Sequence, residues 1–376
     1  MPAVSNVLVV GGGLSGTAAA ILLAEAGVAV DLAEINPAVS ALGSGITLQG
    51  NALRVLRQLG VLDECTAAGY PFSKFVVRIP DQRATVVAEM DDLPFGGPDL
   101  PSTMGMYRPN LARILVSRAE RAGVSFRFST SVEALAQDDS GVDVRFADGS
   151  SGRYDVVVGA DGVRSSTRRL VGIDLETRPL GMGAWRMVGP RPADLVSTQA
   201  IFGGPCYIAG VTPTSETGAY WFLVEPVRDR TAQTPAERLA DFLDATRPYH
   251  GPWDEVRDSF TDPADLHYTG FEAHLLDPPW NRGRVVLIGD AVHTCPPTIA
   301  QGAAIGLEDA AVLAELLTTS PAVDDQLWTA FTTRRYARVK TVVEASLQVA
   351  QWNIDHVQGD VPGLTRTIAD LVSQPA

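Results

Sequence analysis

The sequence predicts an α/β protein: a parallel sheet with helices, a second and mainly antiparallel sheet inserted into it, and helices at the C-terminus. The apolar run of residues 7–10 leads into the turn G-x-G-x-x-G and then into an alanine-rich stretch. Two later apolar runs, residues 154–160 and 284–288, also end in turns that contain glycine and aspartate. Residues 176–275 hold aromatic-rich runs of strand character. This order indicates one parallel sheet interrupted by a separate antiparallel block.

The first turn has the pattern of a dinucleotide site. Gly11 permits the tight turn, Gly13 lets the backbone approach a pyrophosphate, and Gly16 lets helix and strand pack closely. A helix predicted from residue 17 to residue 26 would point its N-terminal N–H groups at the anion. The next strand, residues 28–33, ends at Glu34, close to the spacing expected for an acid that accepts ribose hydroxyls. A plain glycine turn and a surface glutamate are the alternative interpretations.

The remaining elements follow from local patterns. Apolar leucines predict a helix that is closed by Gly60, and a second helix should run from Arg108 to about residue 122. Prolines within residues 74–100 indicate edge strands and loops, and residues 124–158 read as strands separated by Asp/Ser/Gly turns. We expect a discontinuous cofactor domain, a substrate or lid domain, and C-terminal helices. The cofactor domain would comprise residues 1–72, 103–175 and 278–320. The substrate or lid domain would comprise residues 73–102 and 176–277, and the C-terminal helices residues 321–376.

Composition restricts the class of protein. With 376 residues, 45% hydrophobic and 20% charged, the chain should form two domains with a large core. A formal net charge of −14 argues against nucleic acid or an anionic membrane as a partner. The three cysteines have no C-x-x-C spacing and the histidines no metal-ligand spacing, so we expect neither disulfides nor a metal. A cytoplasmic protein that is neither exported nor membrane-spanning fits best.

Taken together, these motifs resemble those of the single-component FAD-dependent aromatic monooxygenases, of the p-hydroxybenzoate hydroxylase and tetracycline-inactivating type. The likeness rests on residues 7–34, 155–168 and 289–310, and it includes Trp185-Arg186 and the run from Arg334 to Arg338. It implies a Rossmann-like FAD-binding domain of the glutathione-reductase type. The inserted antiparallel sheet would then carry the substrate.

The resemblance also implies roles for individual residues. Glu34 would hold the adenosine ribose, Arg108 would reach the pyrophosphate or ribityl region, and Asp290 would bind the ribityl hydroxyls. A surface arginine and a simple turn residue are the alternatives for Arg108 and Asp290. The helix that begins near Gly302 would direct its positive end at the flavin N1 and O2, where the reduced flavin is negative. The expected cofactor residues are Gly11, Gly13, Leu14, Ser15, Gly16, Glu34, Arg108, Asp161, Gly162, Gly289, Asp290, Pro297, Gln301, Gly302 and Ala303, of which Pro297, Gly302 and Ala303 would also act in catalysis.

The implied reaction is a monooxygenation. NADH or NADPH would reduce FAD, and O₂ would form a flavin C4a-hydroperoxide that transfers one oxygen atom to a small aromatic or polycyclic substrate. Because the chain has no second G-x-G-x-x-G, the nicotinamide would bind transiently. An FAD-dependent dehydrogenase or oxidase without oxygen transfer is the alternative, and the protein would be a monomer or homodimer. Candidate substrate walls are Ile46, Trp185, Tyr207, Trp221 and Phe222, although the aromatic residues among them fit a core equally well.

Overall fold

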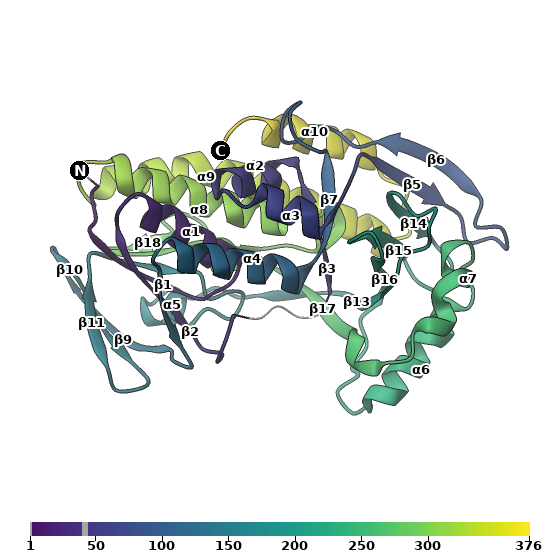
Figure 1. The fold of residues 1–376 in the computed structure, drawn as a ribbon, viewed down its shortest axis with the longest axis horizontal. Coiled ribbons are helices and arrows are strands. Elements are labelled where there is room, and N and C mark those ends of the chain that lie inside the picture. Colours follow the sequence, from purple (N-terminus) through teal and green to yellow (C-terminus); the bar gives the residue numbers. More distant parts are fainter. Residues whose placement is uncertain (1, 40–43) are drawn as a thin grey trace.

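The computed structural model describes residues 2–39 and 44–376, and two large sheets and two small ones organise them (Figure 1). The first large sheet has the strand order β18-β19-β12-β1-β2-β8, and every pairing is parallel except that of β18 with β19. Its strands are β1 (Asn6–Val10), β2 (Ala29–Glu34), β8 (Ser125–Phe128), β12 (Val156–Gly159), β18 (Asn281–Arg282) and β19 (Val285–Leu287).

Both faces of this parallel sheet are covered, which explains why its central strands are apolar throughout. Val7 and Val9 face α1, α4 and α8 in the main core. Leu8 and Val10 face the opposite way, against the three-stranded sheet β11-β10-β9. That small sheet consists of β9 (Val132–Asp138), β10 (Gly141–Phe146) and β11 (Ser151–Tyr154).

The second large sheet is mainly antiparallel, with the order β20-β17-β13-β16-β15-β14-β5-β6. Helices α6 and α7 cover one of its faces (Figure 1). Its strands are β5 (Lys74–Arg78), β6 (Val86–Asp91), β13 (Arg178–Pro190), β14 (Thr198–Phe202), β15 (Ile208–Pro213), β16 (Gly218–Pro226), β17 (Leu266–Leu275) and β20 (His293–Thr294).

The other small sheet contacts the inserted sheet directly and the cofactor side through helices α8 and α4. It has the order β3-β7-β4, with β3 (Gly45–Gln49), β4 (Tyr70–Phe72) and β7 (Thr103–Tyr107). β3 contacts β16, and β7 contacts β15, so this sheet joins the cofactor side to the inserted sheet.

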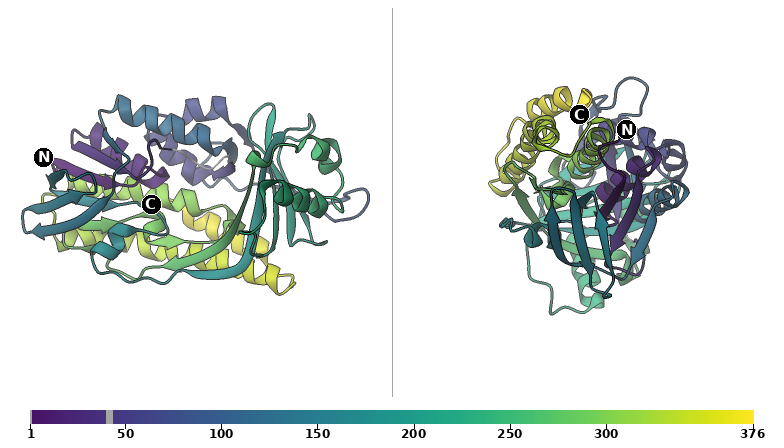
Figure 2. Two further views of the ribbon diagram at one scale, coloured as in Figure 1. Left: turned by 90° about the horizontal axis from the view of Figure 1, so that it is seen from below. Right: turned by 90° about the vertical axis from the view of Figure 1, so that its left-hand side faces the viewer.

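Helices complete the fold. They are α1 (Leu14–Glu25), α2 (Gly50–Gln58), α3 (Leu62–Ala68), α4 (Arg108–Arg121), α5 (Ser166–Leu170), α6 (Pro235–Thr246), α7 (Pro252–Val256), α8 (Gly302–Thr319), α9 (Asp325–Ile354) and α10 (Val361–Ser373), with short 3₁₀ turns η1 (Arg257–Ser259), η2 (Pro263–Asp265), η3 (Gly289–Ala291) and η4 (Pro297–Ile299). The long helix α9 runs beside α8 and extends towards the inserted sheet (Figure 2). Within the described part of the chain, no helix has the length and hydropathy needed to cross a bilayer.

The predicted fold class is confirmed, since a parallel α/β sheet, a mainly antiparallel insertion and C-terminal helices are all present. The helix predicted from Arg108 spans α4, and the helix expected to begin near Gly302 begins at that residue. The division of the chain into three parts at the residue numbers given above stays a prediction.

Candidate cofactor and substrate site

Three adjacent parallel strands end together at one edge of the first sheet. Val10 of β1 pairs with Gly159 of β12, which pairs with Leu287 of β19. The backbone continues the ladder past these ends, with Ile288 N–H donating to Gly159 at 3.0 Å. The turns that follow Val10, Gly159 and Leu287 therefore meet at the carboxyl edge, where open α/β sheets bind ligands.

The first turn has the close packing that its glycines predict. Gly11 has a φ of +105°, and a Cβ there would lie 2.4 Å from the Ala160 carbonyl oxygen. A Cβ on Gly16 would lie 2.0 Å from the Gly11 carbonyl oxygen, so neither position accepts a side chain. Gly13 differs, because a Cβ there would meet no described atom within 4 Å. Open space over Gly13, at the N-terminus of α1, is what a bound pyrophosphate requires.

Glu34 ends β2 beside this turn. Its Oε2 accepts a hydrogen bond from Gly12 N–H at 2.9 Å, and its Oε1 accepts from Asn36 N–H at 3.0 Å. These bonds fix the carboxylate next to the glycine turn. The position matches the expected ribose contact, which stays a prediction.

Asp161 organises its own turn. Its Oδ2 accepts from Ser166 Oγ at 2.9 Å and from Thr167 N–H at 2.9 Å, both in the first turn of the short helix α5, whose N-cap is Ser165. Gly162, with a φ of +76°, has open space where a Cβ would stand. The geometry therefore leaves the Gly162 backbone, rather than the Asp161 carboxylate, available to a ligand.

The Asp290 and Arg108 side chains lie near each other, since each affects the pKa of the other. Both side chains are exposed to water, and neither is hydrogen-bonded to another described residue. Protein nevertheless surrounds them: burial raises the pKa of Asp290, against the opposing effects of His293 and Arg108, and burial lowers the pKa of Arg108. Because exposure combined with desolvation is the behaviour expected at the bottom of an open cleft, we infer that the two side chains line such a cleft.

Helix α8 contacts the η3 turn that contains Asp290, and a loop precedes this helix. η4 ends at Ile299 and is followed by Ala300, whose φ is +54°. Gln301 is the N-cap residue of α8, and its side chain makes no cap hydrogen bond to a described residue. Pro297 is exposed, and Gly302 and Ala303 are partly exposed. The first N–H groups of α8 therefore remain available to a negative ligand group.

The Gln301 side chain turns the other way, into the protein. It is 1% exposed and exchanges two hydrogen bonds with Asn51, at 3.0 and 3.2 Å. It also donates to Gln49 of β3. These amide contacts fix the loop, so only the backbone of Gln301 is free to face the cleft.

A buried ionic network supports the same loop from below. Asp309 of α8 is fully buried, and its Oδ2 accepts from Gly289 N–H at 3.0 Å and from His293 Nε2 at 2.6 Å. Its Oδ1 accepts from Arg335 Nε of α9 at 2.8 Å. These contacts lower the pKa of Asp309 although its burial acts to raise it. Asp309 thus holds the Gly289 turn against two helices.

Glu308 extends this network. It accepts from Arg338 Nε at 2.9 Å and from Arg335 at 3.1 Å, and Asn51 Nδ2 donates to it at 3.3 Å. The sequence shows the acidic pair and the arginine run, but we predicted no role for them. A partial signal was present, because Arg335 and Arg338 lie three residues apart and so share one helix face, from which both can reach the same acids.

The inserted sheet presents opposite faces to two environments. Trp185 and Trp221 are fully buried among Phe242, Trp253 and their neighbours, on the side of α6 and α7. Trp185 Nε1 also donates to buried Glu225 at 3.0 Å. The expectation that these two tryptophans wall the substrate space is therefore wrong, because they belong to the core.

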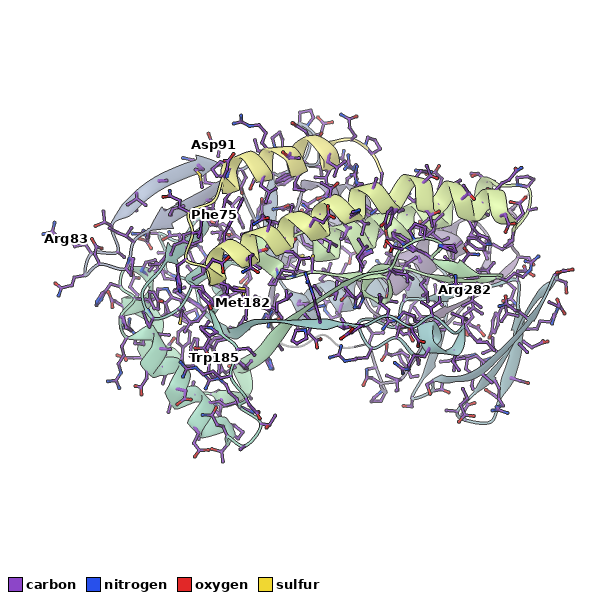
Figure 3. The ribbon with its side chains drawn as sticks, turned by 180° about the vertical axis from the view of Figure 1, so that it is seen from behind. Phe75, Arg83, Asp91, Met182, Trp185 and Arg282 are labelled. Atoms are coloured by element: carbon purple, nitrogen blue, oxygen red, sulfur yellow. The ribbon has the colours of Figure 1, made fainter. Side chains whose placement is uncertain are left out.

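The other candidate walls lie elsewhere. Phe222 alternates with Trp221 along β16 and thus lies on the opposite face, where its ring stacks on Tyr220 at 5.4 Å. Tyr207 contacts His356, just beyond α9, with ring centroids 5.6 Å apart. Ile46 is half-buried on β3. Figure 3 shows the two environments, with Met182 beside the end of α9 and Trp185 near α6.

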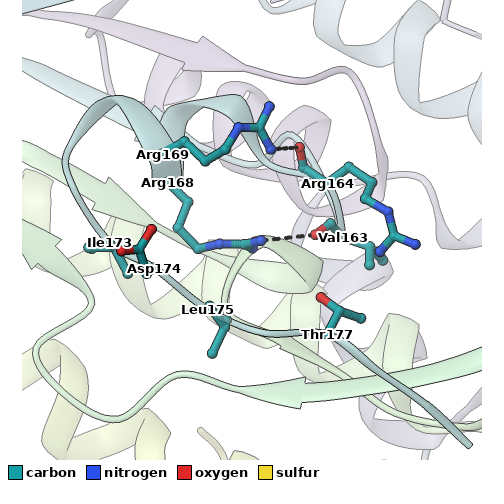
Figure 4. Close-up of a pocket in the computed structure, with 8 residues that line it drawn as sticks. All are labelled: Val163, Arg164, Arg168, Arg169, Ile173, Asp174, Leu175 and Thr177. Carbon is teal, nitrogen blue, oxygen red and sulfur yellow. Dashed lines mark hydrogen bonds between the residues drawn. The ribbon is translucent and has the colours of Figure 1, made fainter.

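A small cavity of about 290 Å³ lies behind the Gly162 turn (Figure 4). Arg164, Arg168 and Arg169 line it. Arg168 is committed to structure, donating to the Ala291 carbonyl at 2.8 Å and to the Val163 carbonyl at 3.1 Å. This cavity does not contain Asp290, Arg108 or the α8 N-terminus, so we place the main site in the cleft that those groups line.

Comparison with known proteins agrees with this geometry. The family model described as "FAD binding domain" matches residues 4–346. The 6-hydroxynicotinate 3-monooxygenase of Bordetella bronchiseptica is 31% identical over 337 residues, covering 83% of this chain and 82% of that protein. Aurachin C monooxygenase/isomerase of Stigmatella aurantiaca is 28% identical over 357 residues, covering 92% of this chain and 90% of that protein.

The fold has close matches among solved structures. Klebsiella pneumoniae HpxO, complexed with FAD and uric acid, superposes with a TM-score of 0.85 at 22% identity, covering 98% of this chain and 97% of that chain. This match concerns the fold. The family match and the relatives' names confirm the expected FAD cofactor and the expected class of enzyme, an FAD-dependent monooxygenase.

Proposed function

Because this chain belongs to the FAD-binding domain family, whose members similar to it include FAD-dependent monooxygenases, we propose that it inserts one oxygen atom from O₂ into a small aromatic or polycyclic substrate. NADH or NADPH is the electron donor. When bound, FAD supplies hydride acceptance and oxygen activation. The remaining tasks fall to this chain's own residues.

The observation that carries the proposal is the convergence of four features at one cleft. The open Gly13 turn, Glu34, Asp290 and the uncapped start of α8 share the carboxyl edge of one sheet. This donor and acceptor set fits FAD, with an acid for the ribose, a glycine turn for the pyrophosphate and a carboxylate for the ribityl hydroxyls. The set stretches across three strand ends, as a long dinucleotide requires.

Each group has a defined task in the proposed reaction. Asp290 orients the cofactor by accepting hydrogen bonds, and Arg108 balances negative charge beside it. The backbone N–H groups of Gly302 and Ala303 stabilise the negative charge of the reduced ring. The inner face of the inserted sheet, with Tyr220 and Phe222, would hold the aromatic substrate and exclude water.

The alternative is an FAD-dependent oxidase that removes hydrogen without transferring oxygen. The names of the relatives favour the monooxygenase. The two reactions differ in where the oxygen goes, which a direct isotope measurement decides.

The test has two stages. The purified protein should be yellow and release FAD rather than FMN, because the Gly11–Gly16 turn and Glu34 form an ADP-ribose site that FMN would leave empty. Aromatic substrates should then accelerate NAD(P)H oxidation above the substrate-free rate, and ¹⁸O₂ should label the product with one oxygen atom. Stoichiometric H₂O₂ with no labelled product from the best substrate would establish the oxidase instead.

A further inference from the structure

The imidazole of His274, on β17, is hydrogen-bonded to the turn that carries Asp290. Its Nε2 lies 3.0 Å from the Asp290 carbonyl oxygen, and its Nδ1 lies 2.8 Å from Thr177 Oγ1. Within residues 2–39 and 44–376, this side chain makes no other hydrogen bond. His274 is only 6% exposed, so water competes little for either contact.

These two partners determine which ring nitrogen carries the proton. A carbonyl oxygen can only accept, so Nε2 must be the nitrogen that donates, and its bond goes to Asp290. Burial lowers the pKa of His274 to about 4, so the ring is neutral near pH 7 and has a single N–H. Nδ1 therefore accepts from the hydroxyl of Thr177. Thr177 thus fixes the ring with its donor towards the turn.

Three side chains from different elements hold the backbone of the η3 turn. Asp309 of α8 accepts from the first N–H of the turn, and Arg168 of α5 donates to the Ala291 carbonyl at 2.8 Å. Both have other partners, because Asp309 belongs to the buried ionic network and Arg168 also holds the turn before α5. His274 is more specific, since its N–H goes to the carbonyl of Asp290 itself.

The Asp290 carboxylate accepts no hydrogen bond from a described residue, so its direction depends on the backbone that carries it. A donor on the carbonyl of the same residue restrains the adjoining peptide group. We propose that His274 is a positioning residue, which acts through the Asp290 carbonyl to hold the Asp290 carboxylate ready for the ribityl hydroxyls of FAD. This inference rests on the proposed function, where Asp290 receives that cofactor contact. A group held in place before binding loses less freedom when the ligand arrives, which strengthens binding.

The test measures FAD binding by equilibrium dialysis of the full-length holoenzyme and compares two amides at position 274. The Gln amide nitrogen can take the place of Nε2, whereas the shorter Asn places its amide near Nδ1 and cannot reach the Asp290 carbonyl. We expect His274→Asn to weaken FAD binding about threefold to tenfold, and His274→Gln to retain most of the affinity. His250→Asn, the same change between α6 and α7, is the matched control and should bind FAD as the parent does.

A double variant separates positioning from a general effect on the structure. If His274 acts through Asp290, its loss should matter little once the carboxylate is absent. In the Asp290→Ala background, we therefore expect His274→Asn to change FAD affinity by less than about twofold. A residue that only supports the fold would cause the same loss in both backgrounds.

Three results would each overturn the inference: unchanged affinity in His274→Asn, equal losses in the Asn and Gln variants, or a loss that persists in the Asp290→Ala background. If His274→Asn fails to fold, ¹⁵N NMR of the parent holoenzyme decides. We expect the Nε2-protonated tautomer, and the Nδ1-protonated one would overturn the inference because it cannot donate to Asp290. Turnover is not measured, so a failure of the proposed function is seen separately, as absence of labelled product although FAD binding follows these expectations.

Discussion

Two carboxylates near the Gly289 turn, those of Asp290 and Asp309, should affect different properties of the protein when they are mutated. Asp290 faces the inferred cleft, is exposed, and its carboxylate accepts no hydrogen bond from a described residue. Asp309 is fully buried and accepts from Gly289, His293 and Arg335. We therefore expect Asp290→Ala to affect FAD binding and Asp309→Asn to affect folding.

The expected magnitudes follow from these contacts. A hydrogen bond to a charged group contributes about 1.5 to 3 kcal/mol, so Asp290→Ala should weaken FAD binding by roughly tenfold to 150-fold. Because burial raises the pKa of Asp290, its ionised form disfavours the folded apo-protein at neutral pH. Apo Asp290→Ala should thus be at least as stable as the parent. Asp309→Asn disturbs a buried ionic network and should lower the free energy of unfolding by about 3 to 5 kcal/mol.

The assay combines two measurements on each apo-protein: titration with FAD, followed by flavin fluorescence, and urea unfolding, followed by circular dichroism. Asp290→Asn serves as the near-isosteric control and should lose less FAD affinity than Asp290→Ala. An apo Asp290→Ala protein that unfolds more easily, or that binds FAD as tightly as the parent, would refute the assignment of Asp290 to the cofactor. An Asp309→Asn protein of unchanged stability would refute the structural role of the network.

Two further predictions concern packing and pH. Burial lowers the pKa of His274 to about 4, so the neutral imidazole stabilises the fold above pH 6.5. This contribution, at most about 3 kcal/mol, is lost as pH falls from 6.5 towards 4. In urea unfolding across this range, the stability of His274→Gln should therefore depend less steeply on pH than that of the parent. A Cβ on Gly306 would lie 2.5 Å from Ser15 Oγ, so Gly306→Ala should destabilise by about 1 to 3 kcal/mol. Adding Ser15→Ala should restore most of that lost stability, because it removes the atom with which the new Cβ collides. No second side-chain substitution should rescue Gly16→Ala in this way, because its Cβ would collide with backbone. Thermal unfolding of the Gly306→Ala and Ser15→Ala double variant is the measurement, and additive effects of the two changes would contradict this packing.

Local patterns in the sequence were sufficient for the cofactor half of the fold. The strand at residues 7–10, the G-x-G-x-x-G turn and Glu34 follow one another within a few dozen residues, so short-range sterics and hydrogen bonding determine their arrangement. Local sequence also predicts the start of α8 after Gln301, because the prolines indicate a loop and the residues after Gly302 indicate a helix. The meeting of three turns at one sheet edge could be predicted because parallel strands carry their carboxyl ends to the same side.

Only the tertiary structure decided which side chains face the proposed substrate space and which support the proposed cofactor cleft. Trp185 and Arg186 are neighbours in the chain, and alternation puts them on opposite faces of a strand, but the packing of α6 and α7 determines which face becomes core. Likewise, Asp309 and Arg335 are joined only because α8 and α9 pack together. Such pairings connect residues that are far apart in the chain. A buried charge requires a partner of opposite charge, but the neighbouring sequence does not show which residue that partner is.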